Sequence, residues 1–236
     1  TYRTIHRSFL SRTCRIYARI CSEDANEARE HRRQRHLEAK KMYILNVWNS
    51  EGVEYEKPKL KMTGIEAVRS STPTACRDAI KKSLEIIMAG SESDLQKYVA
   101  NFKSEFSSLG FDDVAFTRGV KDIDKYWVGG RFQSQTPIHV RGSVVFNEML
   151  KKKKLTNKYQ LITSGEKIKF AYLRNPNPTQ DYVIACPNGL PKELKMETYI
   201  DYAVQFEKGY LSPIESITNT MGWQAEKRAT LEDWFN

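Results

Sequence analysis

The chain has 236 residues, of which 40% are apolar and 11% aromatic, and its 38 basic residues exceed its 29 acidic residues by nine. The aromatic content predicts a folded core and excludes a chain that is disordered throughout. No stretch approaches the roughly 20 consecutive apolar residues of a membrane-spanning helix, so no membrane partner is expected. The excess positive charge favours a polyanionic partner such as nucleic acid.

Much of this charge lies near the N-terminus. Residues 1–41 hold eleven Lys and Arg against five acidic residues, a net charge of +6. Residues 1–22 carry five arginines and no acid, with apolar residues at near-helical spacing. They are compatible with a transit peptide, an amphipathic helix on an anionic surface, or a docking helix. Residues 23–41 are expected to continue as a solvated helix of mixed charge.

The segment after these residues has the pattern of a β-hairpin. An apolar run at 42–48, turn residues at 49–52 and an alternating segment at 53–62 predict a β-hairpin. Pro58 places its second strand at an edge or a break, because proline has no N–H for the ladder.

Two helices are then predicted as an antiparallel pair. The first is capped by Ser71-Thr72-Pro73 and runs to Gly90, and the second runs from Ser93 to Gly110. Their stripes predict these inward residues: Ala79, Ile80, Leu84, Ile87, Met88, Leu95, Tyr98, Val99, Phe102, Phe106 and Leu109.

The remaining chain mixes both element types. Residues 111–141 have the composition of loops, and a short helix over 142–150 is expected to end in Lys151 to Lys154. Strands are predicted at 166–173 and 181–187, followed by helix with a break at Pro213. The pattern predicts an α+β fold with helix in excess.

The sequence offers little catalytic chemistry. P-loop, Rossmann, zinc-protease and nucleophile-elbow motifs do not occur in it. Asp112-Asp113 and the Asp122/Asp124 pair lack a third metal ligand, so no cofactor is expected in this chain. The widely spaced cysteines indicate free thiols rather than a zinc site or a disulfide scaffold: Cys14, Cys21, Cys76 and Cys186.

Several ordered motifs carry a family resemblance. The run KKMYILNVWNSEGVEYEKPKLKMTGIEAVRSSTP (40–73) contains K-K-x-Y, K-L-K-x-x-G-[LI]-E and S-S-T-P. KYWVGG (125–130), PIHVRG (137–142), an E-K strand at 166 and the closing KRATLEDWF follow in order. Residues 40–236 thus resemble the C-terminal palm, thumb and tail of the family B DNA polymerases of T-even-like bacteriophages.

The resemblance implies a division of the chain. Residues 39–70 would be the last palm strands, residues 71–222 a mainly helical thumb with a small β element, and residues 223–236 a tail with a clamp-binding peptide. Residues 1–38 match nothing in the family and are expected to form a basic, helical N-terminal extension.

The resemblance also implies DNA contacts. Lys40, Lys41 and Tyr43 would grip the primer-template duplex, whose minor-groove acceptors lie alike in every correct base pair. Lys59 and Lys61 share a strand face and are weaker DNA-binding candidates, since each could be a solvated edge. The thumb contact to the duplex backbone would use an extended H-x-R-G and a flexible turn, with these residues: Lys125, Tyr126, Gly129, Gly130, His139, Arg141 and Gly142.

One departure from the family bears on catalysis. The two palm motifs whose aspartates hold Mg²⁺ are absent from this sequence. We therefore expect the small C-terminal subunit of a split polymerase, inactive alone, with Mg²⁺ bound only in the assembled enzyme. A larger chain would carry the exonuclease, fingers and catalytic palm, and the complex would work in the host bacterial cytoplasm. A truncated fragment would have the same sequence features.

The tail implies a further partner. Leu231, Trp234 and Phe235 are spaced to share one face of a helical turn, and together with Asp233 they resemble the family's sliding-clamp peptide. The alternative is that these residues fold back onto the thumb. For the whole chain, the rival hypothesis is a stand-alone basic nucleic-acid-binding protein with an N-terminal targeting helix.

Overall fold

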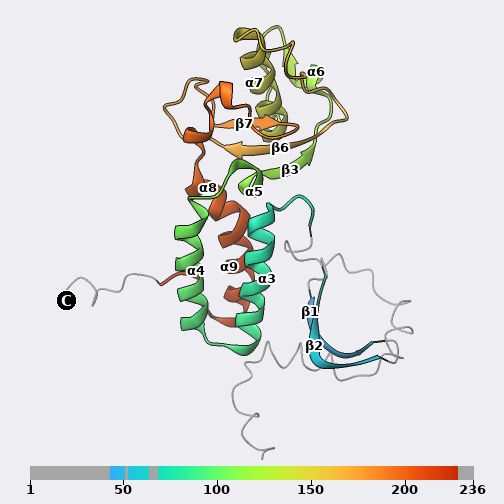
Figure 1. Ribbon diagram of the computed structural model, residues 1–236, viewed down its shortest axis with the longest axis vertical. Coiled ribbons are helices and arrows are strands. Elements are labelled where there is room, and N and C mark those ends of the chain that lie inside the picture. Colours follow the sequence, from blue (N-terminus) through green and yellow to red (C-terminus); the bar gives the residue numbers. More distant parts are fainter. Residues whose placement is uncertain (1–42, 51–52, 64–68, 228–236) are drawn as a thin grey trace, which may run out of the picture.

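A computed structural model describes residues 43–50, 53–63 and 69–227 (Figure 1). It contains helices and small antiparallel sheets, which confirms the predicted α+β class. Within these residues no helix is long and apolar enough to cross a membrane. The basic N-terminal extension and the tail with Leu231, Asp233, Trp234 and Phe235 lie outside the described residues, as do Lys40 and Lys41.

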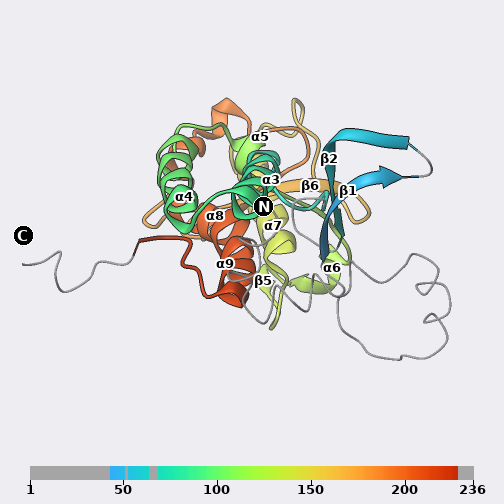
Figure 2. The same ribbon diagram turned by 90° about the horizontal axis from the view of Figure 1, so that it is seen from below.

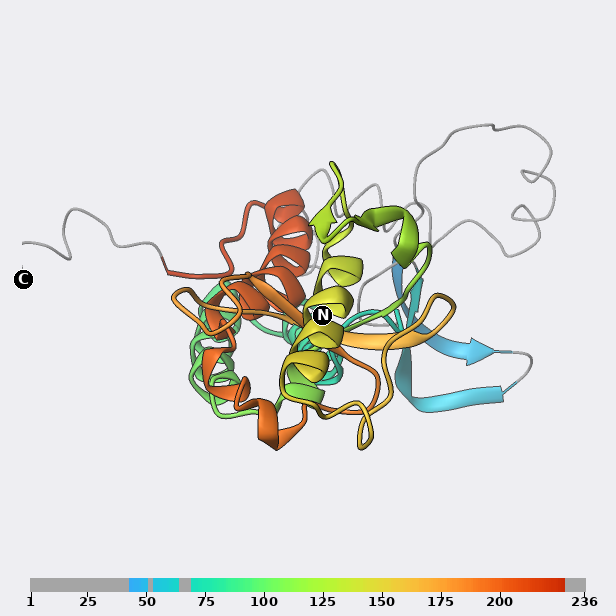
Figure 3. The same ribbon diagram turned by 90° about the horizontal axis from the view of Figure 1, so that it is seen from above.

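The predicted hairpin is present. Strand β1 (Tyr43–Ser50) pairs antiparallel with β2 (Val53–Thr63), and the register shifts between Val47 and Asn49. This irregularity lies opposite the part of β2 that contains Pro58, as expected for a residue that cannot donate to the ladder. The hairpin stands to one side of the rest of the structure in all three orientations (Figure 1, Figure 2 and Figure 3).

A helical body forms the lower half of Figure 1, where α3 (Thr74–Ala89), α4 (Glu92–Phe106) and α9 (Ser212–Thr218) lie side by side. We use "helical body" for these helices together with α8 (Tyr202–Phe206) and the π-helical turn η5 (Glu207–Leu211). The α3–α4 pair confirms the predicted antiparallel helices. Its second helix begins at Glu92, because Ser91 and Asp94 form a reciprocal capping box, and ends at Phe106.

Aromatic packing holds the helical body together. The Phe102 ring lies 4.8 Å from the Tyr210 ring and 5.8 Å from the Phe206 ring, centroid to centroid. The buried Tyr210 hydroxyl shares a 2.7 Å hydrogen bond with Ser83 Oγ on α3. Helices from both ends of the described chain are therefore joined by one core. The predicted stripe holds except at Met88, which is 47% exposed because it lies in the last turn of α3.

The upper half of Figure 1 is a second unit, which we call the α7 module. A sheet of order β3-β6-β7 joins β3 (Phe116–Gly119), β6 (Lys167–Tyr172) and β7 (Val183–Cys186), all antiparallel. Helix α7 (Ile138–Lys152) packs on β7. The two predicted strands correspond to β6 and β7, whereas β3 was missed within the segment expected to be loops.

The module also contains short elements. Helix α5 (Phe111–Val114) precedes β3, and α6 (Ile123–Tyr126) leads into the β4 (Trp127–Val128) and β5 (Arg131–Phe132) hairpin. The 3-10 helices η3 (Lys192–Leu194) and η4 (Glu197–Tyr199) follow β7. Outside the module, a last 3-10 turn, η6 (Asn219–Met221), follows α9 of the helical body.

The predicted helix break at Pro213 is wrong. Pro213 lies at the start of α9, which continues directly from η5. A π-helical turn leaves backbone groups outside the usual i to i−4 pattern, so a proline just after it costs no α-helical hydrogen bond. Gly209 within this turn packs against α3, where an added Cβ would lie 2.9 Å from Cys76 Sγ.

Candidate nucleic-acid interface

Lys59, Lys61 and Tyr43 occupy defined register positions in the β1–β2 hairpin. Tyr43 pairs with Thr63, and Lys61 pairs with Leu45. Directly paired positions of an antiparallel ladder share a face, and alternate positions of one strand do as well. The positions of Tyr43, Lys59 and Lys61 therefore lie on one face of the hairpin.

The segment expected to be flexible around Gly129 and Gly130 is a tight hairpin turn. Both glycines have positive φ, 60° and 74°, as a two-residue turn between β4 and β5 requires. The Trp127 and Phe132 rings face each other across the ladder at 4.6 Å. The hairpin follows α6 directly, so its position is coupled to that of Lys125 and Tyr126.

Lys125 and Tyr126 lie in α6, which contacts α7. The Tyr126 carbonyl accepts a hydrogen bond from Gln133 N at 3.0 Å, which closes the base of the hairpin. Tyr126 is partly buried against the core, whereas Lys125 is exposed, with its ammonium 5.6 Å from the Tyr126 ring centroid. Of the two, Lys125 is free to reach an anion.

The prediction of an extended H-x-R-G is wrong. His139, Arg141 and Gly142 lie in the first turns of α7, which begins at Ile138 after Pro137. Residues two apart on an α-helix point about 200° apart rather than to one side. Pro137 is the N-cap residue directly before this helix, and the predicted helix began four residues too late, at Gly142.

Gly142 is buried under β7, not open to a phosphate. A Cβ at this position would lie 3.0 Å from Ala185 N and 3.1 Å from Ile184 C. The missing side chain lets α7 approach the backbone of β7, and this close approach is the physical reason for a glycine here. We therefore remove Gly142 from the proposed DNA contacts.

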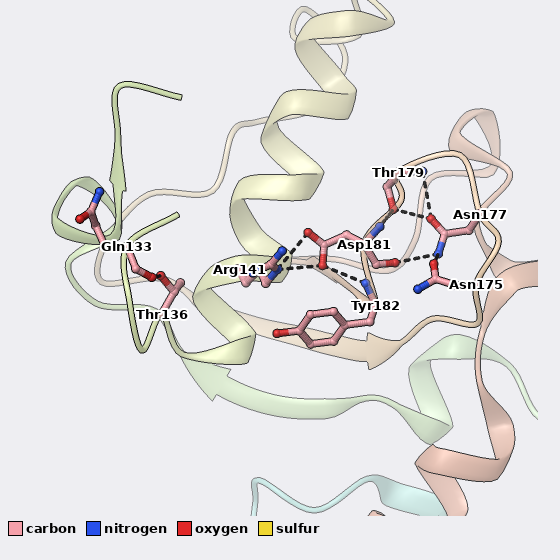
Figure 4. A network of polar contacts seen from close by, with 8 residues as sticks. All are labelled: Gln133, Thr136, Arg141, Asn175, Asn177, Thr179, Asp181 and Tyr182. Atoms are coloured by element: carbon pink, nitrogen blue, oxygen red, sulfur yellow. Dashed lines mark hydrogen bonds and ion pairs between the residues drawn. The ribbon is translucent and has the colours of Figure 1, made fainter. Parts of the chain in front are cut away.

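Arg141 is held inside the module by a carboxylate (Figure 4). Its Nε donates to both carboxylate oxygens of Asp181, at 2.9 and 3.0 Å, and the Asp181 side chain is only 8% exposed. The guanidinium also lies over the rings of Phe132, at 4.3 Å, and Tyr182, at 5.0 Å. The hydrogen bond to Asp181 raises the pKa of Arg141, which is charged at any relevant pH. Arg141 thus ties the β4–β5 hairpin to the loop before β7.

That loop is ordered by Asn177. Its Nδ2 donates to the Asp181 carbonyl at 2.7 Å and to the Arg174 carbonyl at 2.8 Å. Its Oδ1 accepts from the Thr179 backbone N–H at 2.9 Å. These hydrogen bonds fix the position of Asp181, the ion-pair partner of Arg141 (Figure 4).

His139 lies partly buried near the sheet, with its ring 6.3 Å from Phe170. Burial lowers its pKa below the ordinary value, and the nearby charge of Arg118 on β3 lowers it further. Both effects favour the neutral imidazole, so His139 contributes no positive charge near neutral pH.

Four exposed cations lie in the segment from β3 to β5, and of these only Lys125 was predicted as a DNA contact. Across residues 69–227 none of the four forms an ion pair: Arg118, Lys121, Lys125 and Arg131. Their spacing within fourteen residues was a usable signal. The prediction of loops over 111–141 hid this signal, because the segment contains β3, α6 and a hairpin.

No group of three His, Cys, Asp or Glu residues within the described part of the chain could hold a metal ion. Cys76 and Cys186 are free and buried, and burial raises the pKa of the Cys76 thiol to about 12, which leaves it unreactive.

The sequence of the chain is similar to those of known proteins. No family model matches the chain. Over 201 residues it is 32% identical to the "DNA-directed DNA polymerase" of Enterobacteria phage T4 and 35% identical to that of Escherichia phage RB69. Each alignment covers 84% of this chain but 22% of the relative, so the chain spans about a fifth of the length of these proteins.

Proposed function

Because the chain is homologous to the DNA-directed DNA polymerases of T4-like phages, we propose that it is the C-terminal part of such a polymerase and grips the primer-template duplex. The homology carries this proposal. The unpaired cations beside α7 support it, because Lys and Arg that neutralise phosphates supply affinity without reading sequence.

In this proposal the α7 module presents cations to the duplex backbone. Arg118, Lys121, Lys125 and Arg131 contact phosphates, and Arg141 positions the β4–β5 hairpin that carries Arg131. The face of the β1–β2 hairpin that holds the positions of Tyr43, Lys59 and Lys61 adds a second contact, next to Lys40 and Lys41. His139, neutral at pH 7, contributes shape rather than charge.

Nucleotide transfer would require a larger partner chain. It would supply the palm aspartates and the Mg²⁺ ions that they hold, together with the fingers and exonuclease. The tail residues Leu231, Asp233, Trp234 and Phe235 would tether the complex to a sliding clamp, and the complex would act in the cytoplasm of the bacterial host.

The duplex contact is tested by the salt dependence of binding. We expect the variant Arg118→Ala/Lys121→Ala/Lys125→Ala/Arg131→Ala to weaken primer-template binding and to reduce the slope of log affinity against log salt by about 0.9 for every phosphate that the variant no longer neutralises. Lys81→Ala/Lys82→Ala, which removes two exposed cations of α3 that pair with Asp78 and Glu85, is a control for half of this charge change on another surface. An unchanged slope in the fourfold variant would remove the α7 module from the interface.

The partner and the tail are tested together by reconstitution. The chain alone should extend no primer, and co-expression with a larger chain that carries the palm aspartates should give a stable complex that does. Deletion of residues 230–236 should then leave short extension intact and abolish clamp-dependent processivity. A monomer that binds DNA with full affinity and joins no partner would instead support the stand-alone nucleic-acid-binding protein.

A further inference from the structure

A groove of about 510 Å³ opens at the C-terminal end of α7, between that helix and the 3-10 helices η3 and η4. This volume lies in the range of about 300–1,000 Å³ typical of ligand pockets. Its floor is apolar and combines flexible thioethers with rigid rings: Met149, Pro178, Pro191, Leu194, Met196 and Tyr199. Methionine side chains adapt to irregular partners, which suits this floor to aliphatic or aromatic side chains.

The rim of the groove is positively charged. Lys153, Lys192 and Lys195 line it together with a single carboxylate, that of Glu197. Lys192 and Lys195 are exposed, and in the described part of the chain neither forms an ion pair. Lys153 Nζ donates one hydrogen bond to the Glu193 carbonyl at 2.8 Å, which leaves two of its donors for a ligand.

A neighbouring carboxylate does not neutralise this rim. Glu193 forms an ion pair with Lys158 and accepts a hydrogen bond from the Tyr159 hydroxyl at 2.7 Å. These two contacts lower the pKa of Glu193 to about 2. Its charge is thus directed away from Lys192 and Lys195, and the rim keeps its excess of positive charge.

The groove is separate from the proposed DNA contact. Met149 lies near the C-terminal end of α7, whereas the β4–β5 hairpin lies beside the N-terminal end (Figure 3). At about 1.5 Å per residue, this helix of 15 residues separates its two ends by about 20 Å. A ligand in the groove would therefore leave the duplex contact free.

We propose that this groove docks an acidic peptide segment of a partner protein, with a bulky apolar side chain on the floor and Asp or Glu side chains against Lys153, Lys192 and Lys195. The charge of the rim is complementary to such a peptide. A nucleic-acid strand fits less well, because the floor offers aliphatic and thioether groups and one aromatic ring rather than a platform on which successive bases stack. The inference does not depend on the proposed function.

The test uses the full chain and labelled peptides. The probes are twelve-residue peptides in which Asp and Glu surround one or two Leu or Phe residues at varied spacing. We expect at least one probe to bind, and we expect Lys192→Glu/Lys195→Glu to weaken that binding tenfold or more. The control Lys81→Glu/Lys82→Glu makes the same charge change on α3 and should leave peptide binding unchanged. Should the first variant fold poorly in a thermal melt, Lys192→Ala/Lys195→Ala replaces it, with a smaller expected decrease in affinity.

Matched probes separate this proposal from simple charge attraction. Replacing Leu and Phe by Ser should abolish binding, as should replacing Asp and Glu by Asn and Gln. The proposal is overturned if no probe binds, if the Ser peptides bind equally well, or if the reversal at Lys192 and Lys195 has no effect. It is also overturned if a single-stranded oligonucleotide displaces the peptide and itself loses affinity in that variant, since the groove would then bind nucleic acid.

Discussion

The helical body is joined by contacts between aromatic rings, whereas the α7 module has a buried ion pair in addition to its apolar core. In the helical body, Phe102 and Tyr210 join helices distant in sequence through ring contacts. In the α7 module, Arg141 and Asp181 join a hairpin to a loop through an ion pair. Apolar burial gives stability without demanding one geometry, and charged hydrogen bonds demand it. Both units bury apolar side chains, and the α7 module adds an ion pair that fixes the position of its hairpin.

The largest expected effect is loss of an aromatic ring from the helical body. Phe102→Ala should lower the free energy of unfolding by about 3–5 kcal/mol, because it removes buried area and leaves a cavity among three rings. Denaturant unfolding measures this change. Met88→Ala, at an exposed position of α3, should change stability by no more than about 0.5 kcal/mol. Equal effects of the two substitutions would contradict the assigned core.

A smaller effect is expected from the ion pair of the α7 module. Asp181→Asn should cost about 1.5–3 kcal/mol, since it leaves the Arg141 charge without its carboxylate. A double-mutant cycle with Arg141→Met isolates the interaction free energy between the two side chains. Hydrogen exchange should rise around residues 127–132 and 175–182 and stay unchanged in α4. A coupling below about 0.5 kcal/mol would show that the two side chains are not a structural link.

The close approach of α7 to β7 gives the third prediction. Gly142→Ala should destabilise the chain by about 1–3 kcal/mol, because the new methyl group would meet the backbone of Ala185 and Ile184. Gly110→Ala is the control, since nothing lies within 4 Å of the added Cβ and its φ of −73° suits alanine. Thermal unfolding compares the two variants, and a neutral Gly142→Ala would show that the helix can withdraw from the strand.

The smallest effect concerns pH. His139 has a folded-state pKa below its ordinary value of about 6.5, so the folded chain binds fewer protons than the unfolded chain between these two values. Stability should therefore be fully present above about pH 6.5 and fall as the pH falls through the folded pKa. His139→Gln should remove this part of the pH dependence, measured by unfolding at pH 7.5 and at lower pH. If the free energy of unfolding depends on pH in the same way in both proteins, burial does not lower the pKa of His139.

Sequence reasoning succeeded where a pattern had one dominant cause. The stripe containing Leu95, Val99 and Phe102 predicted α4 because burial on one face fixes the period. It failed where tertiary contacts decide. The prediction of an extended segment at His139 to Arg141 rested on the alternation of two residues, which is too short a pattern to establish a strand period. The role of Asp181 had no sequence signal, because its partner Arg141 lies 40 residues away.

The sequence predicted only part of the candidate interface, because tertiary contacts decide the rest. Lys125 followed from the resemblance, and the exposed Arg118, Lys121 and Arg131 could have been found by counting cations near it. Arg141 is held inside the module because the rings of Phe132 and Tyr182 enclose its guanidinium. No spacing pattern in the sequence predicts such an enclosure.

The π-helical turn η5 has a consequence for how this chain can change during evolution. A π turn contains one residue more than the α-helical path, so the deletion of one residue there would restore a continuous α-helix. The positions after it would keep their faces, because the wider turn already accommodates the extra residue. Ile214 and Thr218, both buried, would stay in the core. One residue deleted from the middle of α4 would instead rotate every later position of that helix by about 100°. The loss of an exposed residue such as Lys208 should therefore be tolerated far better than a deletion in α4.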